Sequence, residues 1–261
     1  MRTLAETFAT ARVERRGVLV GYLPAGPGAT EAFTAMVAAG VDVVEVGLPY
    51  SDPVLDGPVI QQAVDRSLAA GTSSADVLRT VEDVARTGVP VLVMTYWNPI
   101  EQYGPDRWAA DLAAAGGAGL ITPDLTPEEA GPWLAAAEEW KLDPVFLVAP
   151  SSTDARVAKI AGLCRGFVYA TAVMGVTGAR RETSAVAPGL VARVRAVTDT
   201  PVGVGLGVST GDQAAEVAGY ADAVIVGSAF VRATLEADSP AAAATAAAAL
   251  AAELAEGVRR R

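Results

Sequence analysis

Residues 43–58 read VVEVGLPYSDPVLDGP, and in this stretch a strand runs into an acidic loop. The β-branched apolar run at its start predicts a short buried strand. Glu45 interrupts that run, and a carboxylate there is costly unless it has a partner or a chemical role. Asp52 and Asp56 follow among prolines. This layout is typical of an α/β active site, although a carboxylate in a structural network would give the same pattern.

Strand-sized runs and helical stretches alternate along the rest of the chain. The expected strands cover 18–23, 41–47, 90–94, 119–122, 144–148, 166–169, 201–204 and 223–226. Alanine-rich stretches with helical periodicity cover 30–39, 75–87, 107–115, 127–140, 153–162, 188–197, 211–218 and 241–255. This alternation predicts the α/β class and a parallel sheet closed into a (β/α)8 TIM barrel, with a single domain over 1–261. A doubly wound open sheet is the alternative.

Two connections are longer than the others, and they follow the second and the sixth expected strands. They cover 48–58 and 173–187. Barrel active sites are built from loops that follow strands, and unusually long loops are more often functional. We therefore expect the site at these two loops. The second loop is rich in glycine, alanine and threonine, so we expect it to close over a bound ligand as a lid.

Glycines cluster after the last three expected strands. The clusters lie at 175–178, 203–209 and 226–228. In barrels, the loops after the seventh and eighth strands commonly bind phosphate together with a helix N-terminus. Glycine lets backbone N–H groups approach phosphate oxygens without a charged side chain. The clusters therefore predict a phosphate site, with glycines that only serve tight turns as the alternative.

Composition excludes several classes of partner. The chain has 261 residues, of which 51% are hydrophobic, and its formal net charge is −10. An acidic chain lacks the basic footprint that nucleic acid or an anionic membrane surface requires. The apolar runs are strand-sized, and we expect none to reach a membrane-spanning length. Residues 1–17 contain no apolar signal core, and Cys164 has no second cysteine to pair with. These features predict a soluble, cytoplasmic protein.

The residue types that are missing narrow the chemistry. The chain has no histidine, which excludes imidazole acid–base steps and histidine-ligated zinc, and we expect no metal. Its two lysines, Lys141 and Lys159, lie after and within expected helices rather than at a strand end. A Schiff-base lysine is therefore not expected. Acid–base chemistry by carboxylates remains, on a substrate that supplies its own electron sink.

Several motifs together resemble one known family. The sequences EVGLPYSDP at 45–53, DGP at 56–58 and GVTG at 175–178 are similar to the signatures of the tryptophan synthase alpha chain family, and the likeness continues through 21–26, 94–99, 122–124 and 227–228. The resemblance implies a (β/α)8 barrel that cleaves indole-3-glycerol phosphate into indole and glyceraldehyde 3-phosphate, in the last steps of tryptophan biosynthesis. It also implies an alpha2-beta2 assembly, with pyridoxal phosphate on the beta chain and no cofactor on this one.

The resemblance also assigns roles at the reacting end of the substrate. Glu45 is expected to be the catalytic acid–base, and burial at a strand end is expected to raise its pKa toward neutrality. Asp56 is expected to accept the indole N–H and stabilise positive charge there. Tyr169 is expected near the reacting carbons, with a plain core aromatic as the alternative. Tyr22 and Tyr96 are expected to line the indole pocket.

The remaining roles concern the phosphate end and the lid. Gly178, Gly207, Gly227 and Ser228 match phosphate-binding positions of the family, and Thr177 is expected to approach the Asp56 loop when the lid closes. Three alternatives remain open at this point. The chain could be a stand-alone lyase that releases indole, a weakly active regulatory subunit that needs a partner, or a phosphosugar isomerase barrel. The isomerase does not account for the Glu45–Asp56 pair.

Overall fold

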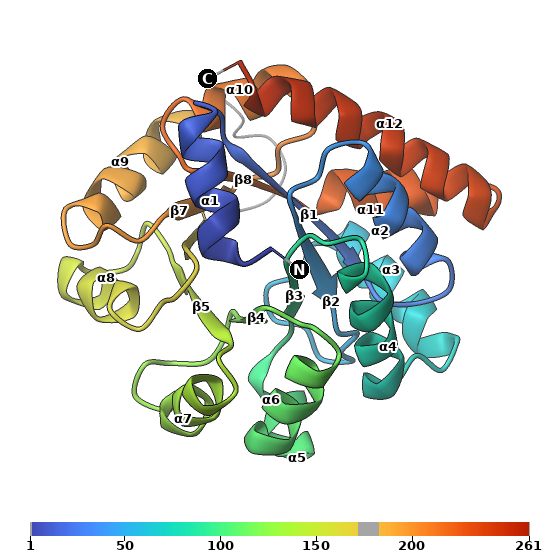
Figure 1. Ribbon diagram of the computed structural model, residues 1–261, viewed down its shortest axis with the longest axis horizontal. Coiled ribbons are helices and arrows are strands. Elements are labelled where there is room, and N and C mark those ends of the chain that lie inside the picture. The colour runs from blue at the N-terminus through green and yellow to red at the C-terminus, as the bar shows by residue number, and fades with distance from the viewer. Residues whose placement is uncertain (1, 172–182, 261) are drawn as a thin grey trace.

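The computed structural model describes residues 2–171 and 183–260, and in this part of the chain eight parallel strands close into a barrel in chain order (Figure 1). The strands are β1 (Val18–Pro24), β2 (Val43–Gly47), β3 (Val91–Met94), β4 (Gly119–Thr122), β5 (Asp143–Val148), β6 (Val168–Thr171), β7 (Val202–Gly205) and β8 (Ala223–Val226). The (β/α)8 barrel is confirmed, and the open doubly wound sheet is wrong, because β8 pairs with β1.

Helices surround the barrel on the outside. They are α1 (Leu4–Val13), α2 (Ala29–Ala38), α3 (Pro58–Ala69), α4 (Ser74–Ala85), α5 (Trp97–Tyr103), α6 (Pro105–Ala114), α7 (Gly131–Glu139), α8 (Asp154–Ala161), α9 (Thr183–Arg195), α10 (Gly211–Ala218), α11 (Ser228–Leu235) and α12 (Pro240–Val258). The sequence did not predict α1, α3, α5 or α11. The long interval between β2 and β3 therefore contains two helices as well as an extended loop.

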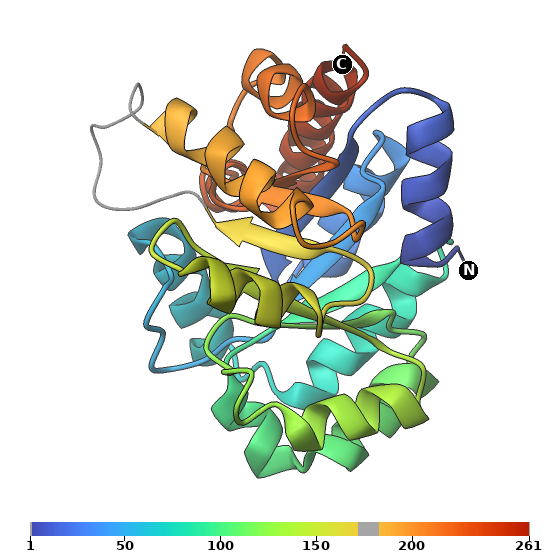
Figure 2. The same cartoon turned by 90° about the vertical axis from the view of Figure 1, so that its left-hand side faces the viewer.

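The half of the barrel in which the strands begin is filled by apolar side chains. Inward-facing residues from most of the strands form one cluster, which contains Val20, Val43, Leu92, Ile121, Val145, Phe167 and Ile225. Helix α1 covers the end of the barrel at which the strands begin (Figure 2), and its Phe8 ring lies 5.9 Å from the ring of Phe167. The interior is therefore a packed core at this end, so we expect a ligand site at the opposite end of the barrel.

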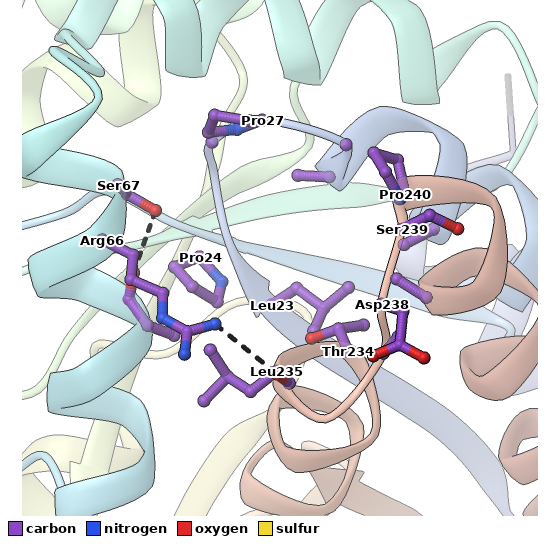
Figure 3. Close-up of a pocket in the computed structure, with 17 residues that line it drawn as sticks. Leu23, Pro24, Pro27, Arg66, Ser67, Thr234, Leu235, Asp238, Ser239 and Pro240 are labelled. Atoms are coloured by element: carbon purple, nitrogen blue, oxygen red, sulfur yellow. Dashed lines mark hydrogen bonds between the residues drawn. The ribbon is translucent and has the colours of Figure 1, made fainter.

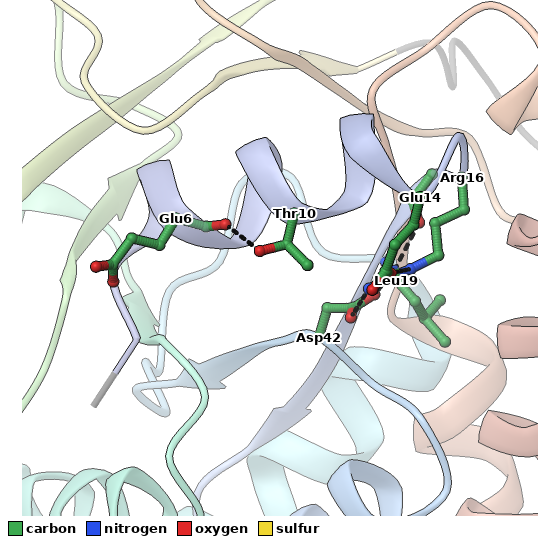
Figure 4. A network of polar contacts seen from close by, with 7 residues as sticks. Glu6, Thr10, Glu14, Arg16, Leu19 and Asp42 are labelled. Atoms are coloured by element: carbon green, nitrogen blue, oxygen red, sulfur yellow. Dashed lines mark hydrogen bonds and ion pairs between the residues drawn. The ribbon is translucent and has the colours of Figure 1, made fainter.

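A charged network joins the α1–β1 turn to the start of β2 (Figure 4). The Arg16 guanidinium donates to both carboxylate oxygens of Asp42, at 2.7 and 2.9 Å, and to Glu14 at 2.6 Å. Asp42 also accepts the backbone N–H of Leu19 at 2.9 Å. Asp42 immediately precedes β2, so this bidentate pair fixes the end of β2 opposite to its active-site end.

Helix α12 is longer and more apolar than the sequence analysis expected. It has 19 residues with a mean hydropathy of 1.3, so by length and composition alone it could cross a membrane, and the expectation that no segment reaches such a length was wrong. In the structure it packs against α2, α10 and α11. Its Glu253 carboxylate accepts the Gly211 N–H at 2.8 Å, which ties it to the start of α10. These contacts are those of a barrel helix.

Loss of the Arg16 guanidinium should destabilise the barrel measurably. We expect Arg16→Ala to lower the free energy of unfolding by about 2–3 kcal/mol, because it leaves a largely buried Asp42 without its charged donor. Urea unfolding measures the change. Arg86→Ala is the matched control, because its ion pairs with Glu82 and Asp83 are exposed and such pairs contribute about 0–1 kcal/mol. Equal losses in the two variants would contradict this role of the Arg16–Asp42 pair.

Candidate active site

Glu45 lies in the middle of β2 and points into the barrel. Its side chain is 1% exposed, and its Oε1 atom has no hydrogen-bond partner among the described residues. Burial raises the pKa of Glu45 from 4.5 to about 8. At neutral pH the group is therefore mostly the uncharged acid, yet it is close enough to its pKa to give up and recover a proton. These are the properties required of a general acid that later becomes a general base.

Two tyrosines lie near Glu45, one on the adjacent strand β1 and one on the more distant strand β6. Tyr22 of β1 lies opposite Glu45 in the strand register, and Tyr169 of β6 is also within electrostatic range of it. Burial raises the pKa of both phenols well above 10.0, and the Glu45 carboxylate adds to the rise. A Cβ on Gly47 would lie 2.5 Å from the Tyr22 hydroxyl oxygen, so the absence of a side chain there makes room for the phenol.

The loop that carries Asp56 is held at the rim of the barrel by Tyr96. The Leu55 N–H donates to the Tyr96 hydroxyl oxygen at 3.0 Å, and the same hydroxyl lies close enough to the Asp56 carboxylate to act on its pKa. Burial raises the pKa of Asp56, and the Tyr96 hydroxyl opposes that rise. Burial also raises the pKa of Tyr96 to about 12, so the phenol keeps its proton to donate. Tyr96 is therefore an anchor for the acidic loop, a role that the sequence did not predict.

The candidate phosphate residues lie at the ends of β7 and β8. Gly207 has φ +78°, which favours glycine. Gly227 is the N-cap of α11 and makes no side-chain capping bond, and Ser228 is the first residue of that helix. Backbone N–H groups at the first turn of α11 thus remain for an anion. The other two candidates, Thr177 and Gly178, lie outside the described residues, as does most of the expected lid.

Three residues near Asp56 had no predicted role. Asp124, just after β4, accepts the Trp97 N–H through both carboxylate oxygens, at 2.9 and 3.1 Å. Asn98 donates to the Tyr50 hydroxyl oxygen at 3.2 Å, and the rings of Tyr50 and Tyr96 lie 5.4 Å apart. The sequence signals for these residues were that all three lie in stretches that resemble the family and that Asp124 comes two residues after an expected strand, where barrel active sites gather their polar groups.

A cavity of about 340 Å³ lies on the outer side of the barrel, away from these residues (Figure 3). Its walls come from the β1–α2 connection, α3 and the α11–α12 connection, and include Leu23, Pro27 and Asp238. At one side of it Arg66 donates to the Leu235 carbonyl oxygen at 3.5 Å (Figure 3). Neither Glu45 nor Asp56 lines this cavity, so it is separate from the candidate active site.

The ionisable side chains of the candidate active site are carboxylic acids and phenols. Fold and site together therefore define a (β/α)8-barrel enzyme with a site of this kind. The family model described as "Tryptophan synthase alpha chain" matches residues 8–259. The tryptophan synthase alpha chain of Salinispora arenicola is 63% identical, with 99% of this chain and 98% of that protein covered. That of Acidothermus cellulolyticus is 59% identical, with 100% and 98% covered. The chain therefore belongs to the tryptophan synthase alpha chain family.

Solved structures support the same assignment. A chain of Mycobacterium tuberculosis tryptophan synthase is similar with a TM-score of 0.91 and 52% identity, and 98% of each chain is covered. The tryptophan synthase alpha subunit of Legionella pneumophila is similar with a TM-score of 0.88 and 31% identity, over 99% of this chain and 98% of that one. The similarity thus extends over nearly the whole chain.

The buried state of Glu45 should be visible in the pH dependence of stability. In the folded protein Glu45 keeps its proton up to a pH of about 8, whereas in the unfolded chain it has its ordinary pKa of 4.5. The Glu45 proton should therefore make the wild type lose stability as pH rises between these values, by roughly 1.4 kcal/mol per pH unit, and Glu45→Gln should lack this part of the loss. Urea unfolding between pH 5 and pH 8 measures this, with exposed Glu139→Gln as the control. Parallel pH profiles for wild type and Glu45→Gln would contradict a buried, protonated Glu45.

Proposed function

We propose that this chain is the lyase subunit of tryptophan synthase and cleaves indole-3-glycerol phosphate into indole and D-glyceraldehyde 3-phosphate. The observation that best supports this proposal is Glu45, a carboxylic acid that is buried inside the barrel, whose Oε1 atom has no partner in the described part of the chain and whose pKa is about 8. Membership of the tryptophan synthase alpha chain family supports the same reaction. The reaction takes place within one domain that spans 1–261.

Glu45 moves both protons of the cleavage. As the acid it donates a proton to C3 of the indole ring, and the positive charge that results on the ring nitrogen makes the ring an electron sink. As the carboxylate it then takes the proton of the adjacent glycerol hydroxyl. The C–O bond becomes the aldehyde carbonyl, the carbon–carbon bond breaks, and its electron pair returns to the ring and neutralises the nitrogen. Glu45 ends protonated, ready for the next substrate.

The other proposed residues bind and orient the substrate. Asp56 accepts the indole N–H and stabilises the positive charge that develops on the nitrogen, while Tyr96 holds its carboxylate. Tyr22 lines the indole pocket, and Tyr169 lies beside the reacting carbons, where its burial next to Glu45 supports this placement.

The phosphate is held by backbone groups rather than by a cation. Gly178, Gly207 and Gly227 bind it together with Ser228, and Thr177 belongs to the lid that closes over it. The uncapped first turn of α11 supports this assignment, because its N–H groups carry the positive end of the helix dipole.

The expected partner is a tryptophan synthase beta chain, in an alpha2-beta2 assembly in the cytoplasm. The beta chain carries the pyridoxal phosphate, and this chain has no cofactor of its own. The exposed tip of the acidic loop supports a docking role, because Val54 is 75% and Leu55 is 60% exposed. A stand-alone lyase that releases free indole would keep the same site, and assays with and without a beta chain distinguish the two.

Removal of the Glu45 proton should abolish most of the activity. We expect Glu45→Gln to lower the rate of indole release from indole-3-glycerol phosphate by about 10²–10⁴-fold, because the amide keeps the shape but transfers no proton. Glycerol phosphate should still bind, since its proposed contacts lie on other loops. Indole release is followed spectroscopically, with Glu139→Gln as the control. Near-normal indole production by Glu45→Gln would refute the acid–base assignment.

A branched side chain at Gly207 should weaken phosphate binding. Gly207 and Gly71 have nearly equal φ angles, +78° and +80°, and a Cβ at either position meets no atom within 4 Å. Gly207→Val and Gly71→Val should therefore lose similar stability, about 1–2 kcal/mol. Only Gly207→Val should lose affinity for glycerol phosphate, by tenfold or more in a calorimetric titration. Unchanged affinity would return Gly207 to a role in the turn alone.

A further inference from the structure

The start of helix α5 is anchored from a distant part of the chain. Tyr96 is the N-cap residue of this helix and makes no side-chain capping bond. Asp124 supplies the cap instead, because both of its carboxylate oxygens accept the Trp97 N–H, at 2.9 and 3.1 Å. A negative charge at the N-terminus of a helix is also favoured by the helix dipole. The connection after β4 therefore fixes where α5 begins, and with it the backbone of Tyr96.

The first turn of α5 in turn grips the acidic loop after β2. The Leu55 N–H donates to the Tyr96 hydroxyl oxygen at 3.0 Å, and the next residue, Asp56, has its carboxylate close enough to that hydroxyl for its pKa to be affected. One residue into the helix, the Asn98 amide donates to the Tyr50 hydroxyl oxygen at 3.2 Å. Asp56 thus depends for its place on Tyr96, and Tyr96 depends for its place on the N-terminus of α5.

We infer that Asp124 is a positioning residue for the lyase reaction, which acts on Asp56 through Trp97 and Tyr96. The inference rests on the proposed function, since it takes Asp56 as the group that stabilises charge on the indole ring. Asp124 itself touches no reacting atom. Its carboxylate holds the α5 terminus, the terminus aims the Tyr96 hydroxyl, and the hydroxyl holds the Asp56 carboxylate where the ring nitrogen becomes positive. A small displacement of such a group lowers the reaction rate rather than the affinity for substrate.

Substitutions of Asp124 test this chain of contacts by steady-state kinetics. Asp124→Ala should lower kcat about tenfold or more with a smaller change in KM, because Asp56 acts mainly in the transition state. Asp124→Asn keeps one oxygen that can accept the Trp97 N–H, so it should recover most of kcat. Asp106→Ala is the matched control, because Asp106 lies in the first turn of the next helix, α6. Thermal unfolding of each variant checks that the barrel is intact.

A double-mutant cycle separates positioning from general destabilisation. If Asp124 acts through Tyr96, Asp124→Ala should cost much less in kcat when Tyr96→Phe is already present. The same fold-loss in both backgrounds, or an unchanged kcat in Asp124→Ala alone, would overturn the inference.

Amide hydrogen exchange gives a second readout that needs no activity. The Leu55 N–H should exchange faster in Asp124→Ala, as in Tyr96→Phe, and at the wild-type rate in Asp106→Ala. Wild-type protection of Leu55 in Asp124→Ala would overturn the inference. A wild-type enzyme that releases no indole would refute the proposed function instead, and the exchange comparison would still decide whether Asp124 positions the loop.

Discussion

The rest of the structure is arranged around one constraint, which is that the carboxylic acid of Glu45 is buried away from solvent. Glu45 is 1% exposed, and neighbouring side chains in the barrel interior, such as those of Val43 and Leu92, are apolar. Transfer of a charged carboxylate into this environment is expensive, so the group stays protonated and its pKa rises to about 8. The same packing that stabilises the barrel thereby sets the proton affinity that general acid catalysis near neutral pH requires.

Stability and chemistry occupy opposite ends of β2. At its start, Asp42 is bound by the Arg16 guanidinium and by the Leu19 N–H, and α1 seals the core below the strands. At its end, the chain leaves the barrel in a loop that is held by a few hydrogen bonds, among them those from the Leu55 N–H to the Tyr96 hydroxyl and from Asn98 to the Tyr50 hydroxyl. A rigid lower end and a lightly held upper loop are the division expected of a barrel enzyme, in which catalytic loops are placed by a scaffold that they do not stabilise.

The barrel could be predicted from the sequence because most strands are short apolar runs bounded by a helical pattern, which is a local signal. Helix α5 could not, because seven residues are too few to show a period. Helix α3 begins at Pro58, a good start signal that lay inside the stretch interpreted as loop. Glu45 and Asp56 stood out as acids in unusual places, whereas the roles of Tyr96 and Asp124 depend on contacts between residues 41 and 27 positions apart. No local pattern encodes such contacts.

Glu45 and Asp56 are both carboxylic acids, and their surroundings rather than their residue types give them different roles. The Oε1 atom of Glu45 has no hydrogen-bond partner among residues 2–171 and 183–260, so this oxygen is available to exchange a proton with a substrate. Burial raises the pKa of Asp56 as well, but the nearby Tyr96 hydroxyl opposes that rise. A carboxylate beside a hydroxyl donor suits a fixed countercharge for the indole nitrogen, and the buried Glu45 suits proton transfer. The loop supplies the first environment and the strand supplies the second, so a stretch of twelve residues from Glu45 to Asp56 provides both functions.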